Sequence, residues 1–266
     1  MRQSKSKARS KSIDVNFDVT RSGPDWLVAR PIAHRGLHDA KSGIVENTAS
    51  AIEAAIEGGY GIEVDLQATR DGDAVVHHDA ALGRITKGEG RIDALTVAEL
   101  KRVAFRTTRD RMLTIGELCD LVAGRATLLL ELKTNAAFNR RVMTRVAQVL
   151  ATYPGPAAVM SFDPALVGMA RAIAPGLVRG LVAQRRRSTA DIGVRGGNTA
   201  NAYWRELAAA APQFLAYSIA DLPGAIPWLA RSVLRIPLLT WTVRNERERR
   251  VACRWADQMI FEGFRP

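Results

Sequence analysis

The chain has 266 residues, and its 38 Lys and Arg residues exceed its 27 Asp and Glu residues by 11 charges. Hydrophobic residues make up 47% of the sequence, which excludes a disordered or fibrous protein. No apolar run approaches the roughly 18 residues that a membrane-spanning helix needs, and two cysteines exclude a disulfide framework. The basic excess predicts an anionic partner, such as nucleic acid, a membrane surface or a phosphate-bearing substrate.

The start of the chain is strongly basic. Residues 1–12 contain five basic side chains and no acidic one, which predicts a disordered tail over residues 1–25 ahead of one domain at 26–266. No apolar stretch follows this tract, so no secretory signal is expected, and a cytoplasmic protein is predicted. A second basic cluster at 185–187 precedes a polar loop. The basic runs lack the spacing of known nucleic-acid motifs, so no specific nucleic-acid partner is predicted.

From Pro31 onward, short apolar strands alternate with helical patterns. The first third predicts a strand at 31–34, a helix at 47–57 and a strand at 60–66 that turns at Asp71-Gly72 into a hairpin partner. The further expected elements are a helix from Thr114, strands at 127–132, 157–161, 177–183, 214–218, 237–243 and 258–261, and helices at 138–150, 164–173, 223–234 and 245–255. This many β-then-α units favour a closed TIM barrel, of (β/α)8 type, over an open sheet.

In such barrels the chemistry lies at the carboxyl ends of the strands, and polar side chains gather there in this sequence. Glu63 and Asp65 share one face of their strand, as do Glu131 and Lys133 of another. If these faces point into the barrel, three carboxylates and one ammonium group converge at its mouth. Neighbouring carboxylates repel one another, and a hard divalent cation would relieve that repulsion. The alternative, a solvated outer face, is disfavoured by the apolar residues that alternate with the acids.

All four histidines lie in the first third of the chain. His34 and one of the neighbours His77 and His78 stand at strand ends, where two imidazoles would serve as general acid and general base. Spacing alone does not decide between His77 and His78, which face opposite ways. His38, in the loop after the first strand, is expected to be an ordinary loop residue.

Several motifs share their order and spacing with a known family. They are His34-Arg35-Gly36, Glu46-Asn47-Thr48, Glu63-x-Asp65, Asp71-Gly72, Val75-Val76-x-His78-Asp79 and Glu131-x-Lys133, followed by Ser161-Phe162 and Trp241-Thr242-Val243. Together they closely resemble the glycerophosphodiester phosphodiesterase family. The resemblance extends from about Pro31 to Gly263.

The resemblance implies a TIM barrel that hydrolyses glycerophosphodiesters to glycerol 3-phosphate and an alcohol. It implies a divalent cation, Ca²⁺ or Mg²⁺, and a small insertion at about 80–112. The implied metal ligands are Glu63, Asp65 and Glu131. The implied acid–base pair is His34 and His78, because the family places its catalytic His directly before Asp. The implied substrate-binding and phosphate-binding residues are Arg35, Glu46, Asn47, Lys133 and Trp241.

The sequence departs from the family pattern at its last strand. Residues 258–263 lack the Thr-Asp pair that often ends this family, and the sequence leaves open whether Asp257 or Glu262 substitutes for it. The loop at 184–213 is unusually polar and basic, which leaves the released alcohol undetermined. The oligomeric state is likewise not predicted.

Two other functions stay open. The first is a phospholipase D-like reaction on lysophospholipids, with apolar and Arg side chains of 222–239 making weak peripheral contact with an anionic membrane. An ordinary barrel helix with an exposed basic edge is the preferred interpretation of that segment. The second is a catalytically inactive barrel that binds nucleic acid through its basic surface. The intact set of candidate catalytic residues disfavours it.

Overall fold

The computed structural model describes residues 23–135, 137–185 and 210–266. Nearly all of the predicted basic tail, and most of the polar loop with its basic cluster, lie outside the described residues. The first described element is the 3-10 turn η1 (Asp25–Leu27). Its Leu27 is fully buried and packs into the barrel core. The boundary predicted between tail and domain therefore falls within this turn.

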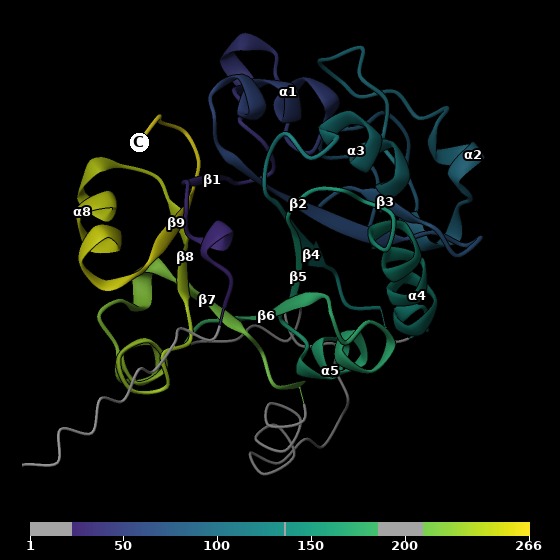
Figure 1. The fold of residues 1–266 in the computed structure, drawn as a ribbon. Helices are drawn as coiled ribbons and strands as arrows, with labels where there is room; N and C mark the ends of the chain where they lie inside the picture. The colour runs from purple at the N-terminus through teal and green to yellow at the C-terminus, as the bar shows by residue number, and fades with distance from the viewer. Residues whose placement is uncertain (1–22, 136, 186–209) are drawn as a thin grey trace, which may run out of the picture.

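The described residues form a ring of eight parallel strands (Figure 1). In chain order these are β1 (Ile32–Ala33), β2 (Gly61–Ala68), β4 (Leu128–Leu132), β5 (Ala157–Ser161), β6 (Val178–Ala183), β7 (Phe214–Ser218), β8 (Leu238–Val243) and β9 (Gln258–Phe261). Strand β1 pairs in parallel with both β9 and β2, which closes the ring. Strand β3 (Ala74–Val76) lies outside it, antiparallel to β2. The predicted TIM barrel is confirmed.

Helices cover the outside of the ring, as the alternating sequence pattern predicts. They are α1 (Ala49–Glu57), α3 (Ile115–Val122), α4 (Asn139–Leu150), α5 (Pro164–Ile173) and α8 (Glu246–Trp255). Helix α3 begins at a capping box in which Thr114 and Glu117 bind each other's backbone N–H groups. Among the described helices, none combines the length and apolar character needed to cross a bilayer.

Two of the predicted helices differ from the structure. Helix α1 starts two residues later than predicted, because Asn47 adopts a left-handed φ of 59° and directs its side chain to Asp65. The helix predicted at 223–234 is present but begins later and is not α-helical throughout. It is a short helix, α7 (Ala225–Trp228), that continues as a π-helical turn, η5 (Leu229–Val233). Gly224 stays extended and delays the start, and the N–H of Leu234 donates to the carbonyl of Leu229, five residues back.

The segment between β3 and α3 forms a small subdomain where the insertion was expected. It contains η3 (Ile92–Ala94) and α2 (Val97–Leu100), and isolated bridges join Ala81 to Arg91 and Thr86 to Phe105. Apolar side chains from the segment, among them those of Ile92 and Phe105, form a core of their own. The subdomain therefore has its own packing beside the barrel.

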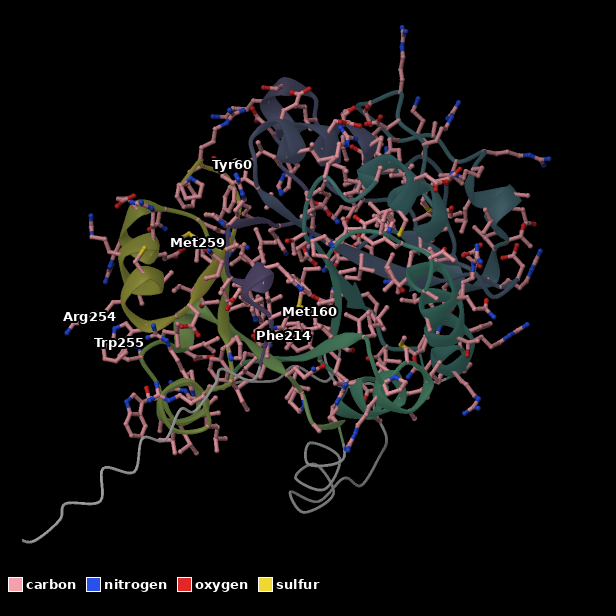
Figure 2. All side chains as sticks on the ribbon, in the orientation of Figure 1. Tyr60, Met160, Phe214, Arg254, Trp255 and Met259 are labelled. Carbon is pink, nitrogen blue, oxygen red and sulfur yellow. The ribbon has the colours of Figure 1, made fainter. Side chains whose placement is uncertain are left out.

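Apolar side chains fill the barrel below its mouth. Phe214 and Met160, labelled in Figure 2, belong to an interior cluster with Leu27 and Ile260. Gly180 on β6 makes room for the Phe214 ring, since a Cβ at Gly180 would lie 2.2 Å from that ring. A closely packed interior of this kind leaves only the carboxyl ends of the strands available for polar side chains.

Candidate active site

Three carboxylates meet at the mouth of the barrel. Glu63 and Asp65 lie on β2, and Glu131 lies opposite Asp65 on the neighbouring strand β4. Each contributes a carboxylate oxygen, and these oxygens lie within 4.8 Å of one another. All three residues are buried. The structure thus brings together the carboxylates that the strand alternation predicts to share the barrel interior.

Two cations neutralise part of this charge. The Nζ of Lys133 lies 2.7 Å from Asp65 Oδ1 and 2.5 Å from Glu131 Oε1. The Nε of Arg35 lies 3.2 Å from Asp65 Oδ2. Burial alone would raise the pKa of Asp65, but these two cations hold it well below its usual range. Burial likewise favours neutral Lys133, yet the adjacent carboxylates raise its pKa and keep it charged.

Of the three carboxylates, Glu63 is the one whose negative charge is least neutralised by neighbouring cations. Burial and the charges of Asp65 and Glu131 raise the pKa of Glu63 well above its usual value. Its Oε2 accepts the Arg35 backbone N–H at 2.9 Å, whereas Oε1 is buried without a hydrogen-bond partner among the described residues. Oxygen ligands of this kind are what Ca²⁺ and Mg²⁺ prefer. The arrangement therefore fits a divalent cation held by Glu63, Asp65 and Glu131.

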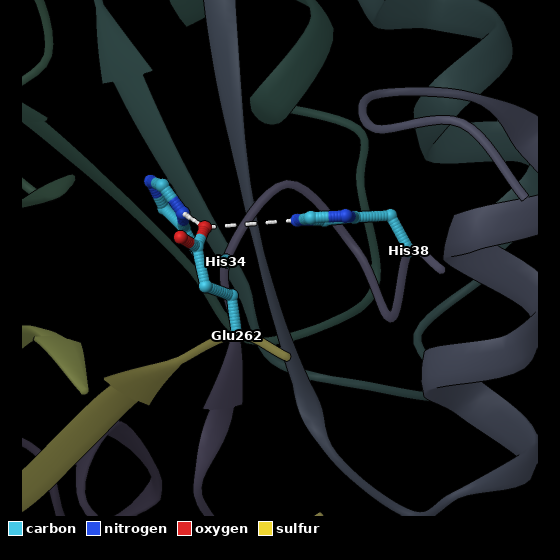
Figure 3. A group of neighbouring side chains, drawn as sticks. All are labelled: His34, His38 and Glu262. Atoms are coloured by element: carbon cyan, nitrogen blue, oxygen red, sulfur yellow. Dashed lines mark hydrogen bonds and ion pairs between the residues drawn. The ribbon is translucent and has the colours of Figure 1, made fainter. Parts of the chain in front are cut away.

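His34 follows β1 and points towards this group. Its Nδ1 lies 2.6 Å from Glu262 Oε2, and its Nε2 lies 3.9 Å from Glu63 Oε2 (Figure 3). The Nε of Arg244 holds the other oxygen of Glu262 at 2.5 Å. Burial opposes ionisation of Glu262, but the hydrogen bond from His34 and the nearby His38 and Arg244 lower its pKa. The Glu262 carboxylate thereby fixes the orientation of the His34 ring.

Glu262 resolves the alternative that the sequence left open. Asp257 is occupied elsewhere, with its Oδ1 2.9 Å from the Nε of Arg231 and its Oδ2 accepting the Leu238 N–H. His38, expected to be an ordinary loop residue, has its Nε2 3.7 Å from Glu262 Oε2. Ring closure is the signal that would have found Glu262, because the residues that follow the first and last strands of a closed barrel are neighbours.

His78, two residues after β3, is held in a matching arrangement. Its Nδ1 lies 2.8 Å from Asp79 Oδ1, and the Nε of Arg84 lies 2.6 Å from Asp79 Oδ2. Each of the two histidines thus has a carboxylate at Nδ1, and each carboxylate is held by an arginine. This pairing orients both rings and leaves both Nε2 atoms for the site.

The structure also separates His78 from His77. His77 is buried, its Nδ1 lies 2.9 Å from the Asp79 carbonyl oxygen, and burial lowers its pKa. His78 instead lines a cavity of about 500 Å³ together with Glu131, Lys133 and Phe162. Another hollow of similar size lies between α3 and α4, away from these polar groups. The cavity at the mouth is therefore the candidate active site.

The predicted phosphate-side residues surround the carboxylates. Asn47 donates to Asp65 Oδ2 at 2.9 Å and accepts the Asp65 backbone N–H at 3.2 Å. Glu46 does not reach the carboxylates. It holds the Nη1 of Arg35 at 2.8 Å and both Nη atoms of Arg84, at 3.1 and 2.5 Å. Glu46 therefore positions Arg35, and Arg84 links Glu46 to Asp79.

Trp241 lies near this cavity but does not line it. Its ring packs edge-on against Phe162, with 5.4 Å between the centroids, and its Nε1 donates to the Ala216 carbonyl at 3.1 Å. Phe162 lines the cavity itself. Trp241 therefore supports the apolar wall on which part of a substrate would rest.

Arg84 is a positioning residue that sequence reasoning did not single out, and its replacement tests the arrangement around His78. We expect Arg84→Met to lower kcat about 10- to 100-fold with a smaller change in KM, because Asp79 and Glu46 both lose their anchor. Arg84→Lys should recover part of the loss. The measurement is steady-state kinetics, with circular dichroism to verify folding. A variant with unchanged kcat would show that Asp79 orients His78 without Arg84.

Comparison with known proteins gives a consistent picture. Residues 34–264 match the family model described as the glycerophosphoryl diester phosphodiesterase family. A glycerophosphodiester phosphodiesterase of Caldanaerobacter subterraneus subsp. tengcongensis is 31% identical over 163 residues, which are 58% of this chain and 66% of the relative. Glycerophosphodiester phosphodiesterase 1 of Bos taurus is 45% identical over 74 residues, 27% of this chain and 21% of the relative. The chain thus spans less than two thirds of the length of these relatives.

A solved structure supports the fold. The phosphodiesterase OLEI02445 of Oleispira antarctica, solved in complex with the product sn-glycerol-3-phosphate, superposes with a TM-score of 0.74. The alignment covers 90% of this chain and 95% of that protein, at 21% sequence identity. At this identity the likeness establishes the shared barrel.

Proposed function

Because the chain belongs to the glycerophosphoryl diester phosphodiesterase family, we propose that it hydrolyses glycerophosphodiesters to glycerol 3-phosphate and an alcohol. One observation supports this proposal most directly. Three buried carboxylates lie together, a Glu63 oxygen among them lacks a hydrogen-bond partner among the described residues, and two histidines nearby are each oriented by a further carboxylate. Such a site combines a place for a divalent cation with two groups that transfer protons near neutral pH.

Each residue of the site has a chemical role in the proposal. A cation bound by Glu63, Asp65 and Glu131 would polarise the phosphate and offset the charge of the transition state. Arg35 and Lys133 bind the phosphate oxygens, Arg35 through a guanidinium that Glu46 holds in place.

The two histidines move the protons. One imidazole Nε2 takes the proton from the attacking oxygen, and the other donates a proton to the departing alkoxide. The carboxylates at Nδ1 stabilise whichever ring is protonated, since Glu262 and Asp79 stay ionised beside them. The attacking oxygen belongs either to water or to the glycerol hydroxyl of the substrate, in which case a cyclic phosphate forms first.

The proposal is tested by identifying the products from a panel of soluble glycerophosphodiesters. We expect glycerol 3-phosphate and the free alcohol, loss of activity in EDTA, and recovery on addition of Ca²⁺ or Mg²⁺. Phosphorus NMR during turnover distinguishes direct hydrolysis from a cyclic intermediate. Full activity in chelator would contradict the metal requirement, and absence of turnover on the whole panel would contradict the substrate class.

The proposal also covers the identity of the metal ion and the cellular compartment of the protein. Ca²⁺ and Mg²⁺ are the candidate cations, because the ligand set consists of carboxylate oxygens. A cytoplasmic location fits the two cysteines, which are both free, Cys119 buried and Cys253 exposed. Recovery of activity by one cation at a much lower concentration than the other would identify the better fit.

A further inference from the structure

One segment of the barrel wall exposes large apolar side chains. Ile226, Trp228, Leu229, Val233 and Leu234 are each 46–57% exposed. In the part of the chain that the structure describes, these are all of the exposed large hydrophobic residues. They lie within nine residues of α7, η5 and the position that follows. We refer to these five residues as the apolar ridge.

The ridge inverts the usual pattern of a barrel helix. The buried residues of α7 and η5 are Pro227 and Ala230, so small side chains face the barrel while large ones face outwards. An outer helix that only covers two strands places its large apolar residues inwards. Contiguous apolar patches on a protein surface mark interaction sites. The ridge is therefore a candidate interaction surface outside the barrel core.

A basic edge borders the ridge. Trp228 and Arg231 line a small groove of about 130 Å³ together with Arg254 and Trp255 at the end of α8. The guanidinium of Arg254 lies 5.4 Å from the centre of the Trp255 ring, and Figure 2 labels both residues. Arg250 is exposed one helical turn earlier on α8. Asp257 pairs with Arg231, so the positive charge of this edge comes from Arg250 and Arg254, in a chain with a net charge of +11.

We propose that the apolar ridge docks the protein peripherally on an anionic lipid bilayer. Trp228 and Leu229 would lie at the level of the headgroups, where Trp is favoured, with Arg250 and Arg254 at the lipid phosphates. The combination of exposed Trp, aliphatic residues and a positive edge matches an anionic bilayer better than a neutral apolar partner. The proposal goes beyond the phosphodiesterase function, which requires no membrane.

The position of the ridge relates docking to the mouth of the barrel. Strand β7 ends at Ser218 on the mouth side, and only η4 (Ile219–Asp221) and a short turn separate it from α7. The rest of the ridge lies towards the amino ends of the strands, since Arg231 pairs with Asp257 directly before β9 and Trp228 shares a groove with Trp255 at the end of α8. Docking through it would therefore leave the mouth of the barrel open to soluble substrate.

The test is sedimentation of the full chain with lipid vesicles. Vesicles of phosphatidylcholine alone are compared with vesicles in which phosphatidylglycerol replaces about a third of the lipid. We expect binding to the anionic vesicles, and about tenfold or greater loss of binding in the Trp228→Ser/Leu229→Ser variant. Arg250→Gln/Arg254→Gln should weaken binding most at low salt. All variants keep the basic residues 1–12, so these residues cannot account for a difference.

The matched control removes two exposed arginines elsewhere. Arg102 and Arg111 are exposed and follow α2 in the chain, and Figure 1 shows α2 on the opposite side of the molecule from α8. We expect Arg102→Gln/Arg111→Gln to bind as the unmodified chain does. Equal loss in this control, or no binding of the unmodified chain, would overturn the proposal. Light scattering provides a second criterion. If the unmodified chain is a dimer and the Trp228→Ser/Leu229→Ser variant is a monomer, a second copy of the chain covers the ridge, which would overturn the proposal.

Activity separates this proposal from the proposed function. The ridge variants should hydrolyse a soluble glycerophosphodiester as fast as the unmodified chain, because no ridge residue lines the mouth cavity. Circular dichroism verifies that they fold. Loss of vesicle binding with full activity supports docking alone. Vesicle binding without phosphodiesterase activity would contradict the proposed function and leave docking intact.

Discussion

His34→Ala and His78→Ala are each expected to lower kcat by about 10²–10⁴-fold, with the barrel intact. Each substitution removes one proton-transfer group and leaves the carboxylate cluster in place. The loss of kcat in the double variant should be much smaller than the product of the two single losses, because the two groups act as a unit. Steady-state kinetics measures the effect, and circular dichroism measures folding.

His77→Gln provides the control for His78. His77 lies next to it in sequence but contacts the Asp79 carbonyl and does not line the mouth cavity. We expect this variant to lose stability because His77 is buried, with kcat changed less than tenfold. Near-normal kcat in His78→Ala, or a large loss in His77→Gln, would reverse the assignment of the two histidines.

Glu63→Gln is expected to abolish activity while stabilising the metal-free fold. The folded-state pKa of Glu63 is raised by burial and by Asp65 and Glu131, so its ionised form opposes folding. That destabilisation grows as pH rises from the unfolded pKa of a glutamate to the raised folded value. Gln removes the charge and donates an amide hydrogen towards the neighbouring carboxylates. At neutral pH in EDTA, Tm should rise, whereas kcat should fall at least about 10³-fold with loss of a metal ligand.

Asp65→Asn should have the opposite effect on stability. Asp65 neutralises Lys133 and Arg35, both of which stay charged beside it. Its loss leaves Lys133 with Glu131 alone and Arg35 with Glu46 alone, so we expect destabilisation at or below the value of about 3–5 kcal/mol that is typical of breaking a buried ion pair. Thermal unfolding of the two variants in EDTA therefore gives shifts of opposite sign. A fall in Tm for Glu63→Gln would show that another cation already compensates its charge.

Periodicity predicted most of the barrel because each strand is apolar and each helix has one apolar face. It also placed Glu63, Asp65 and Glu131 on the inner face, since strand geometry fixes that relation locally. Asn47 was assigned to a helix because a polar residue before a periodic run normally starts one. Its left-handed backbone depends on a hydrogen bond to a residue 18 positions away, which no local pattern contains.

The carboxylate partners of His34 and His78 also show that local sequence patterns do not contain long-range contacts. His78 and Asp79 are adjacent in sequence, so their pairing follows from a local motif. His34 and Glu262 are 228 positions apart and meet only because β1 and β9 pair. The departure of the last strand from the family pattern hid this contact, since the longer Glu side chain follows Phe261 in place of the usual Thr-Asp. The sequence indicated 222–239 as a possible membrane contact but favoured an ordinary barrel helix there, because helical periodicity does not specify which face turns inwards.

The contact between His34 and Glu262 joins the first strand of the ring to the last. An unfinished barrel, still attached to a ribosome without β9, would contain every other site residue and yet leave His34 without its carboxylate. Onset of turnover therefore reports the moment at which the circle of strands becomes complete. The same reasoning makes enzymatic activity a more stringent measure of refolding than helix content, because helices need only local hydrogen bonds whereas turnover needs the two ends of the ring to meet.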